Sequence, residues 1–221
     1  MSCIMKSLKL GCQPLDDLLG GGLEQGIITK VFGEAGTGKT NLLLQASREC
    51  IRAGGTVAYI DTEGVSLERL RQICTKQEYP KILENMKVFS PTSFAEQETI
   101  LSDVCTLKDV DCITVDTMNM FYRLELEGDR ESGMRSFLRQ MTQLQLTARK
   151  KNLYVVIAEQ VYTDKNGEIK PFSHRETDHM VKTVIKLERK GIGERQATLM
   201  KHRFQPEGKT AIFRITHHGL E

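Results

Sequence analysis

Short apolar runs alternate with longer amphipathic segments along the first 160 residues of the chain. The runs have the length of strands and cover residues 27–32, 57–60, 88–89, 112–115 and 153–158. The segments between them have helical spacing and predict helices over residues 41–53, 67–76, 94–108 and 131–151. Strands and helices that alternate in this way predict an α/β fold with a mainly parallel central sheet flanked by helices.

The pattern changes after residue 161. Residues 162–179 show no clear periodicity and predict a long loop. Three strand-like segments follow at residues 181–187, 196–200 and 211–215, with glycine- or proline-containing turns between them. Short strands joined by such turns predict β-hairpins at the edge of the sheet.

The first strand leads directly into the pattern G-x-x-x-x-G-K-[ST], which is typical of a phosphate-binding loop. Its glycines let the backbone turn several N–H groups toward a phosphate, and the following helix adds the positive end of its dipole. Lys39 is expected to reach the β- and γ-phosphates of ATP, and the Thr40 hydroxyl to ligate Mg²⁺. A glycine-rich turn without a ligand is the alternative. The candidate nucleotide-binding residues are Gly33, Glu34, Ala35, Gly36, Thr37, Gly38, Lys39, Thr40 and Asn41.

Length and composition narrow the class of protein. With 221 residues, 39% of them hydrophobic, the chain is long enough for one domain over residues 1–221 that begins with a short lead over residues 1–14. No apolar run has the length of a membrane span or of a signal peptide. The six cysteines lack metal-ligand spacing, which is typical of reduced thiols. We therefore expect a cytoplasmic protein with no membrane partner.

Charge is distributed unevenly along the chain. The formal net charge is only +2, but residues 1–160 carry 19 Lys/Arg against 21 Asp/Glu, whereas residues 161–221 carry 12 against 8 and all five histidines. A basic C-terminal third is compatible with contact to a polyanion. Ordinary exposed lysines and arginines give the same balance, so charge alone leaves both interpretations open.

Polar side chains at the ends of three apolar strands are candidates for nucleotide chemistry. Asp116 has the position of a Walker B carboxylate that holds Mg²⁺ opposite Thr40. Glu63 could orient a water for attack on the γ-phosphate. Gln160 could sense that phosphate and transmit its presence to the long loop after it. The plainer alternatives are a strand that happens to end in Asp, a loop acid and a polar residue that closes a strand.

Two basic residues, Lys201 and Arg203, follow the second of the C-terminal strands. Alternate residues of a strand share one face, so both side chains could project together at the nucleotide of a neighbouring subunit. Charge on an edge strand also keeps that strand soluble. The pattern is compatible with either role.

Three segments together resemble the ATPase core of the archaeal RadA and eukaryotic recombinases in the RecA superfamily. They are LDDLLGGGLE at residues 15–24, the phosphate loop at residues 33–40, and YIDTEG at residues 59–64 with ERL at residues 68–70. The similarity extends from about residue 10 to the C-terminus. No helix-hairpin-helix domain and no Phe-x-x-Ala polymerisation motif precede residue 15, an architecture most similar to the archaeal RadB family of recombinase paralogues.

The resemblance implies roles for the matched residues. Glu63 corresponds to the water-activating glutamate and Gln160 to the γ-phosphate sensor, so that these two and Lys39 are the expected catalytic residues. Arg69 corresponds to an arginine that packs on adenine, and Asp116 to the Walker B aspartate. Two DNA-binding loops are implied at residues 118–131 and 161–180. Their candidate contacts are Phe121, Tyr122, Arg123, Arg130, Lys165, Lys170, Phe172, His174 and Arg175.

One departure concerns the segment that caps the ATP of a neighbour. Lys201 stands where the recombinases carry an aspartate, although Pro206 is retained. Lys201 and Arg203 instead look like the Lys-x-Arg finger of KaiC-like and hexameric-helicase relatives, which act in trans. A cation at this position changes how ATP bridges two subunits.

The resemblance implies an ATP- and DNA-binding accessory protein of homologous recombination and DNA repair, with a weak Mg²⁺-dependent ATPase and no strand exchange. The implied partners are single-stranded or branched DNA, a RadA-type recombinase, a Holliday-junction nuclease and further copies of the chain. The alternatives are a nonenzymatic mediator whose nucleotide is structural, and a KaiC- or helicase-like oligomeric ATPase.

Overall fold

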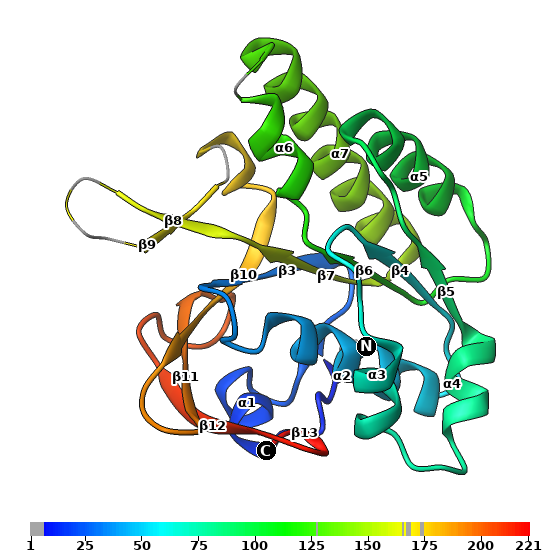
Figure 1. Ribbon diagram of the computed structural model, residues 1–221, viewed down its shortest axis with the longest axis vertical. Helices are drawn as coiled ribbons and strands as arrows, with labels where there is room; N and C mark the ends of the chain where they lie inside the picture. Colours follow the sequence, from blue (N-terminus) through cyan, green and yellow to red (C-terminus); the bar gives the residue numbers. More distant parts are fainter. Residues whose placement is uncertain (1–6, 127, 165, 167–168, 173–174) are drawn as a thin grey trace, which may run out of the picture.

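A nine-stranded sheet runs through the computed structural model, which describes residues 7–126, 128–164, 166, 169–172 and 175–221 (Figure 1). The strands lie in the order β13-β12-β11-β10-β3-β7-β6-β4-β5. Their bounds are β3 (Ile27–Gly33), β4 (Val57–Asp61), β5 (Met86–Phe89), β6 (Cys112–Asp116), β7 (Tyr154–Glu159), β10 (Val181–Arg189), β11 (Glu194–Lys201), β12 (Thr210–Thr216) and β13 (Gly219–Leu220).

The strands from β10 to β5 in this order are parallel, and β11, β12 and β13 extend the sheet antiparallel from β10. The predicted α/β fold with hairpin strands at the sheet edge is therefore confirmed. Because parallel strands end at the same edge of a sheet, the ends of β3, β7, β6 and β4 bring residues from four distant parts of the chain together.

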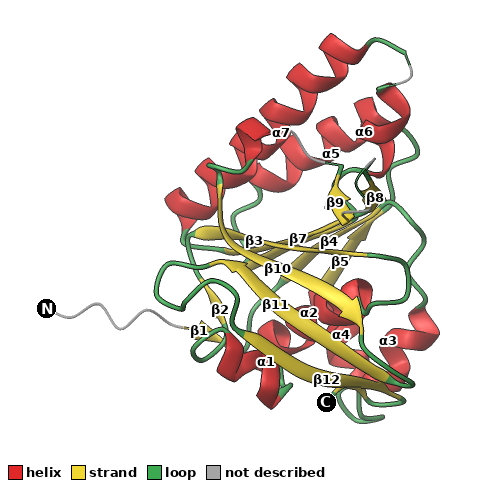
Figure 2. Ribbon diagram, turned by 90° about the vertical axis from the view of Figure 1, so that its left-hand side faces the viewer, coloured by secondary structure: helices red, strands yellow, loops and turns green. Residues whose placement is uncertain are grey.

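Helices cover both faces of the sheet (Figure 2). One face carries α1 (Gln13–Leu18), α2 (Lys39–Arg52), α3 (Leu67–Ile73) and α4 (Tyr79–Asn85), and the other carries α5 (Phe94–Thr106), α6 (Met120–Glu125) and α7 (Arg130–Lys151). Within the described part of the chain, no helix combines the length and apolar character that a membrane span requires. The described cysteines are free thiols.

Each central strand contributes to two hydrophobic cores because successive side chains point to opposite faces. In β4, Val57 and Tyr59 pack under α2, whereas Ala58 and Ile60 pack against the layer of α5 and α7. All four are fully buried. Burial on both sides explains why the central strands are continuous apolar runs and do not alternate with polar residues.

The long helix α7 shows how local sequence sets the ends of an element. The Asp129 side chain accepts a hydrogen bond from Ser132 N, which caps the first turn. At the other end, Asn152 has a left-handed backbone with φ of 56°, a conformation that Asn tolerates better than most residues. The bounds agree with the helix predicted over residues 131–151.

Three sequence-based expectations need correction. The helix predicted over residues 67–76 ends at Ile73, and a second helix, α4, follows. Pro80 lies in the first turn of α4, where a backbone N–H has no partner within the helix and proline is therefore tolerated. The predicted loop over residues 162–179 contains the hairpin of β8 (Val161–Thr163) and β9 (Ile169–Pro171) and the 3₁₀ helix η1 (Arg175–Thr177). In addition, α6 forms inside the first implied DNA loop.

The described N-terminal residues join the same body. Strand β1 (Ser7–Leu8) pairs antiparallel with β2 (Leu23–Glu24), and Leu10 is buried against the α2 side of the sheet. The α2 residue Gln45 ties both ends of the described chain together, since its Nε2 donates to Leu10 O at 3.0 Å and its Oε1 accepts from Leu220 N at 2.5 Å.

Candidate nucleotide-binding site

The phosphate loop spans the turn between β3 and α2. Gly36 and Gly38 have φ values of 74° and 105°, backbone conformations that favour glycine. A Cβ on Gly33 would lie 2.3 Å from Leu187 O, so only glycine lets β10 approach the start of the loop. Gly36 and Gly38 are therefore required by the backbone conformation of the turn, and Gly33 is required by the close approach of β10.

Lys39 folds back over the loop that carries it. Its Nζ donates to Gly33 O at 2.8 Å and to Glu34 O at 3.1 Å. Burial lowers the pKa of Lys39, while the nearby carboxylates of Glu63 and Asp116 oppose that shift. A lysine held in this position can exchange its two carbonyl partners for phosphate oxygens.

A cavity of about 530 Å³ lies over the loop. Besides the loop and Asn41, the cavity is lined by residues that follow β4 and β7, by one residue of α6 and by two residues of β8, namely Glu63, Gln160, Arg123, Val161 and Tyr162. The sheet therefore places the phosphate loop, the predicted water-activating glutamate and the predicted sensor around one space.

Asp116 ends β6 at the floor of the site and is 2% exposed. Tyr59 donates a hydrogen bond to its Oδ2 at 2.8 Å, and Oδ1 has no hydrogen-bond partner among the described residues. Burial raises the pKa of Asp116, and hydrogen bonds from Thr40 and Tyr59 oppose that rise. A buried carboxylate oxygen with no partner, beside the Thr40 hydroxyl, is the donor set that Mg²⁺ prefers. The residues present therefore fit that ion.

The loop that carries Glu63 is held by Asp61. The Asp61 carboxylate accepts hydrogen bonds from the backbone N–H groups of Glu63, Gly64 and Val65 at 3.2, 2.8 and 2.6 Å. Glu63 Oε1 in turn accepts from Thr117 Oγ1 at 3.0 Å and from Gln160 Nε2 at 2.6 Å. The glutamate is thus fixed from both its backbone and its side chain.

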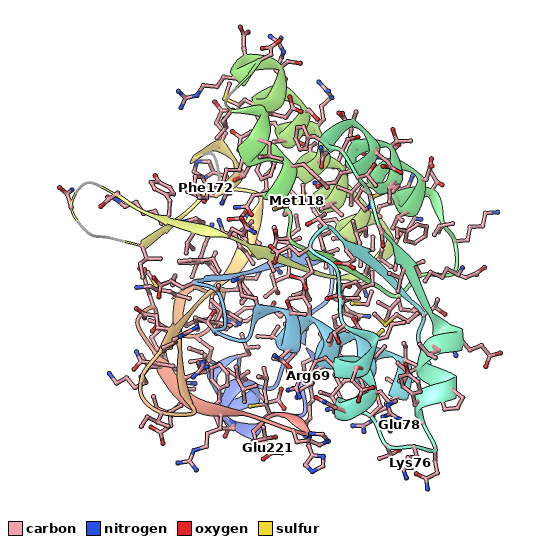
Figure 3. The ribbon with its side chains drawn as sticks, in the orientation of Figure 1. Arg69, Lys76, Glu78, Met118, Phe172 and Glu221 are labelled. Atoms are coloured by element: carbon pink, nitrogen blue, oxygen red, sulfur yellow. The ribbon has the colours of Figure 1, made fainter. Side chains whose placement is uncertain are left out.

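Gln160 connects the nucleotide cavity to the hairpin. Asn119 holds its backbone, because Gln160 N donates to Asn119 Oδ1 at 2.8 Å and Asn119 Nδ2 donates to Gln160 O at 3.0 Å. Arg123 Nη1 donates to Gln160 Oε1 at 3.2 Å, and its guanidinium lies 5.5 Å from the centre of the Phe172 ring. Phe172, labelled in Figure 3, leaves the end of β9 and lies against Tyr162, with ring centres 4.7 Å apart.

Arg69 extends from α3 toward the C-terminal strands (Figure 3). Its guanidinium donates to Asn41 Oδ1 at 2.5 Å and to the backbone oxygens of Thr216 and His217 at 2.8 and 3.1 Å. Asn41 lines the cavity over the phosphate loop. Arg69 therefore contacts a residue that lines the cavity but does not line the cavity itself. This position is compatible with the base end of a nucleotide.

The implied DNA-contact residues separate into distinct groups. Arg123 and Arg130 are exposed near the hairpin, and Lys170 on β9 pairs with Asp164 at 2.5 Å. Tyr122 is a correction, because its ring is only 4% exposed and stacks on Phe137 at 4.3 Å in the core. Lys165 and His174 lie outside the described residues, and Arg175 is described only as part of η1.

Lys201 and Arg203 do not lie beside the phosphate loop of their own chain. Strand β11 ends at Lys201, so the alternation that predicted a shared face does not extend to Arg203. Lys201 Nζ donates to Asp178 O at 2.7 Å, whereas the Arg203 guanidinium lies 3.9 Å from the buried carboxylate of Glu24. Because β11 runs antiparallel to β10, this end of the strand points away from the phosphate loop.

Sequence reasoning missed four residues that shape the site. Asp61 and Asn119 support Glu63 and Gln160, as described above, and Arg189 and Arg195 donate to carbonyl groups of the phosphate loop at 2.9 and 3.0 Å. Asp61 carried a usable signal, since an aspartate at the start of a turn often accepts a hydrogen bond from the backbone two residues on, and Gly64 follows three residues later. The other three depend on contacts between distant segments.

Fold and site together define a RecA-like P-loop protein, because a phosphate-loop sequence, a buried aspartate that ends β6 and a glutamate that follows β4 lie at one edge of a mainly parallel sheet. The Rad51 family model matches residues 3–221. The chain belongs to the Rad51 family and, within it, to the RadB proteins.

Individual relatives support this assignment. The chain is 41% identical to the DNA repair and recombination protein RadB of Methanococcoides burtonii, over 100% of both chains. It is 38% identical to the protein of the same name from Pyrococcus furiosus, over 97% of this chain and 95% of the relative. A crystal structure of the RadB recombinase superposes with a TM-score of 0.85 at 35% identity and covers 97% of this chain and 98% of that one.

Proposed function

We propose that this chain is an ATP- and DNA-binding accessory protein of homologous recombination and DNA repair, with a weak Mg²⁺-dependent ATPase and no strand exchange. The observation that supports this function best is the continuous set of contacts from Glu63 through Gln160 and Arg123 to Phe172. It joins the nucleotide cavity to the hairpin where the second DNA loop is implied. The single RecA-like domain over residues 1–221 and a cytoplasmic location are part of this proposal.

The residues have defined roles in nucleotide binding and turnover. Bound Mg·ATP supplies the phosphoryl group and the cation that neutralises its charge. Thr40 and Asp116 would hold the Mg²⁺, and Lys39 would hold the β- and γ-phosphates. Among the described residues, both hydrogen bonds to the Glu63 carboxylate end on Oε1. Oε2 is therefore the oxygen that would orient an attacking water.

Gln160 would slow turnover and link the site to DNA. Its amide donates to Glu63 Oε1, so this hydrogen bond holds the glutamate in a resting position and leaves only Oε2 for the attacking water. A phosphate that recruits the Gln160 amide would release Glu63 and would also move the partner of Arg123. Nucleotide state and the position of Arg123 beside the hairpin are thereby coupled.

DNA would contact the exposed cations and rings around the hairpin. Arg123, Arg130 and Lys170 are candidates for phosphate contacts, with Lys165 and Arg175 in the same implied loop. Tyr162 is 41% exposed and is a candidate for stacking on a base. A RadA-type recombinase and a Holliday-junction nuclease remain proposed protein partners.

The test measures single-stranded DNA affinity with and without Mg·ATP in wild type and Lys39→Ala. We expect affinity that falls as salt rises and that depends on ATP only in wild type. Multiple-turnover ATPase assays of Glu63→Gln, with the exposed Glu68→Gln as the matched control, test the chemistry. Unchanged turnover in Glu63→Gln would remove this residue from the mechanism, and DNA binding that ignores Lys39→Ala would favour the nonenzymatic mediator.

A second candidate, an oligomeric KaiC- or helicase-like ATPase, is favoured by one observation. Lys201 and Arg203 lie at the end of β11 that points away from the chain's own phosphate loop, so a role for them at a nucleotide requires another copy. Size-exclusion chromatography with and without ATP decides between the candidates. A stable ring that is lost in Lys201→Ala supports the second, and a monomer or dimer supports the first.

A further inference from the structure

Arg189 and Arg195 donate hydrogen bonds to the backbone of the phosphate loop from the C-terminal strands. Arg189 Nη2 donates to Ala35 O at 2.9 Å, and Arg195 Nε donates to Gly36 O at 3.0 Å. The Arg189 guanidinium lies so close that a Cβ on Gly36 would be 2.6 Å from its Nη2. Two successive carbonyl groups at the apex of the loop therefore each receive a cationic donor.

Strand register places both arginines at this end of the sheet. Leu187 on β10 is paired with Gly33 on β3, and Arg189 is paired with Arg195 across β10 and β11. Arg189 lies two positions beyond the buried Leu187 on β10, and Arg195 lies two positions before the buried Ala197 on β11. Each arginine is therefore on the same face of the sheet as the buried residues of its strand. Where the core ends and the phosphate loop begins, the inward positions change from apolar to cationic.

These bonds act on the two peptide units that carry the N–H groups of Gly36 and Thr37. A hydrogen bond from a cation to a carbonyl oxygen polarises its peptide unit, which strengthens the N–H at the other end. It also fixes the carbonyl oxygens outward, which keeps the N–H groups turned into the loop. Both effects favour an anion inside the loop, and the two guanidinium charges add to them.

We propose that Arg189 and Arg195 are positioning residues for nucleotide, which set the affinity of the loop for phosphate through the Ala35 and Gly36 carbonyls. This inference rests on the proposed binding of nucleotide at residues 33–40. It separates the cations of the C-terminal sheet into two sets. Arg189 and Arg195 serve the nucleotide of their own chain, whereas Lys201 and Arg203 lie at the opposite end.

The experiment compares wild type with Arg189→Gln, Arg195→Gln and Lys190→Gln. Lys190 is the matched control, because it is exposed beside Arg189 and the substitution removes the same charge. Dissociation constants for ATP and ADP come from fluorescent-nucleotide displacement at 25 °C, adenosine serves as a competitor without phosphate, and circular dichroism gives Tm without nucleotide.

We expect each arginine variant to bind ATP and ADP about tenfold more weakly, because the loop loses one positive charge beside the phosphates and one donor that orients its N–H groups. Adenosine competition, the nucleotide-free Tm and the Lys190→Gln affinity should match wild type. Wild-type ATP affinity in both arginine variants would overturn the inference, and so would an equal loss of ATP affinity in Lys190→Gln. It would also be overturned if adenosine affinity fell equally, or if the loss of ATP affinity came with a lower nucleotide-free Tm. A wild-type protein that binds no ATP would instead contradict the proposed function.

Discussion

Asp61→Asn is the substitution that most directly tests how the Glu63 loop is held. The carboxylate is 7% exposed and accepts three backbone N–H bonds. Asparagine can keep Oδ1 for Glu63 N and Gly64 N. Its second terminal atom becomes an NH₂ group, which faces the Val65 N–H that now donates to Oδ2 at 2.6 Å. One bond to a charged acceptor is therefore replaced by two opposed donors.

The expected cost follows from that exchange. Loss of one hydrogen bond to a charged group, with its part-buried donor left opposite an NH₂ group, should lower the free energy of unfolding by about 2–3 kcal/mol. For a chain of this length each kcal/mol corresponds to roughly 2–4 °C in Tm. The Tm should thus fall by about 4–12 °C. ATP turnover should also fall, but less than in Glu63→Gln, because the loop is released at Val65 while Oδ1 still holds Glu63 N and Gly64 N.

The assay combines thermal unfolding followed by circular dichroism with multiple-turnover ATPase measured well below the lower Tm. Asp103→Asn on the exposed side of α5 is the control for loss of charge alone. Wild-type Tm in Asp61→Asn would refute the claim that its carboxylate fixes the loop. A lower Tm with wild-type turnover would instead show that Glu63 does not depend on this loop for its position.

Three further predictions concern the floor of the site, the sheet and the hairpin. Burial raises the folded-state pKa of Asp116 above its unfolded value, so the ionised carboxylate destabilises the fold at pH values above that raised pKa. This destabilisation disappears as pH falls through the raised pKa, so Asp116→Asn should raise the nucleotide-free Tm more at pH 8 than at pH 4. The same substitution should abolish Mg²⁺-dependent ATP binding. Lys30→Met should lower the free energy of unfolding in urea by about 3–5 kcal/mol, because it removes a buried ammonium group that lies 3.5 Å from the buried Glu159 carboxylate and 3.4 Å from Asp178. Lys30→Met combined with Glu159→Leu should recover most of that loss. Phe172→Leu removes the ring under Arg123 and should weaken single-stranded DNA binding several-fold in fluorescence anisotropy, and unchanged affinity would contradict the proposed role of the hairpin.

The sequence predicted those parts of the molecule that depend on neighbouring residues. The phosphate loop is eight consecutive residues, and its glycines, Lys39 and Thr40 can be recognised without knowledge of any other segment. The central strands were recognised because burial on both faces requires a continuous apolar run. Position at the ends of those strands also singled out Glu63, Asp116 and Gln160. Parallel pairing brings Glu63 and Gln160 to the lining of one cavity and leaves Asp116 buried at the neighbouring end of β6.

Local pattern was misleading where packing overrides it. From the sequence, Tyr122 beside Arg123 is predicted to be an exposed residue that stacks on a base. In the structure, Tyr122 is part of α6, and its ring stacks on Phe137 in the core. Residues 162–179 lack strand periodicity because the β8–β9 hairpin projects from the sheet, as Figure 1 shows, and is not buried on either face as the central strands are. A two-stranded ribbon of this kind needs little apolar alternation.

Only the tertiary structure decided which side chains act on the phosphate loop from elsewhere. Arg189 and Arg195 are 154 and 159 residues from the carbonyls they contact, and the identity of a single arginine says nothing about such a partner. Strand register determines the contact, because it sets β10 beside β3 and the start of β11 beside the end of β10. The same register carries Lys201 and Arg203 to the opposite end. The sequence by itself therefore determined that a phosphate loop exists, and the pairing of distant strands determined which cations support it.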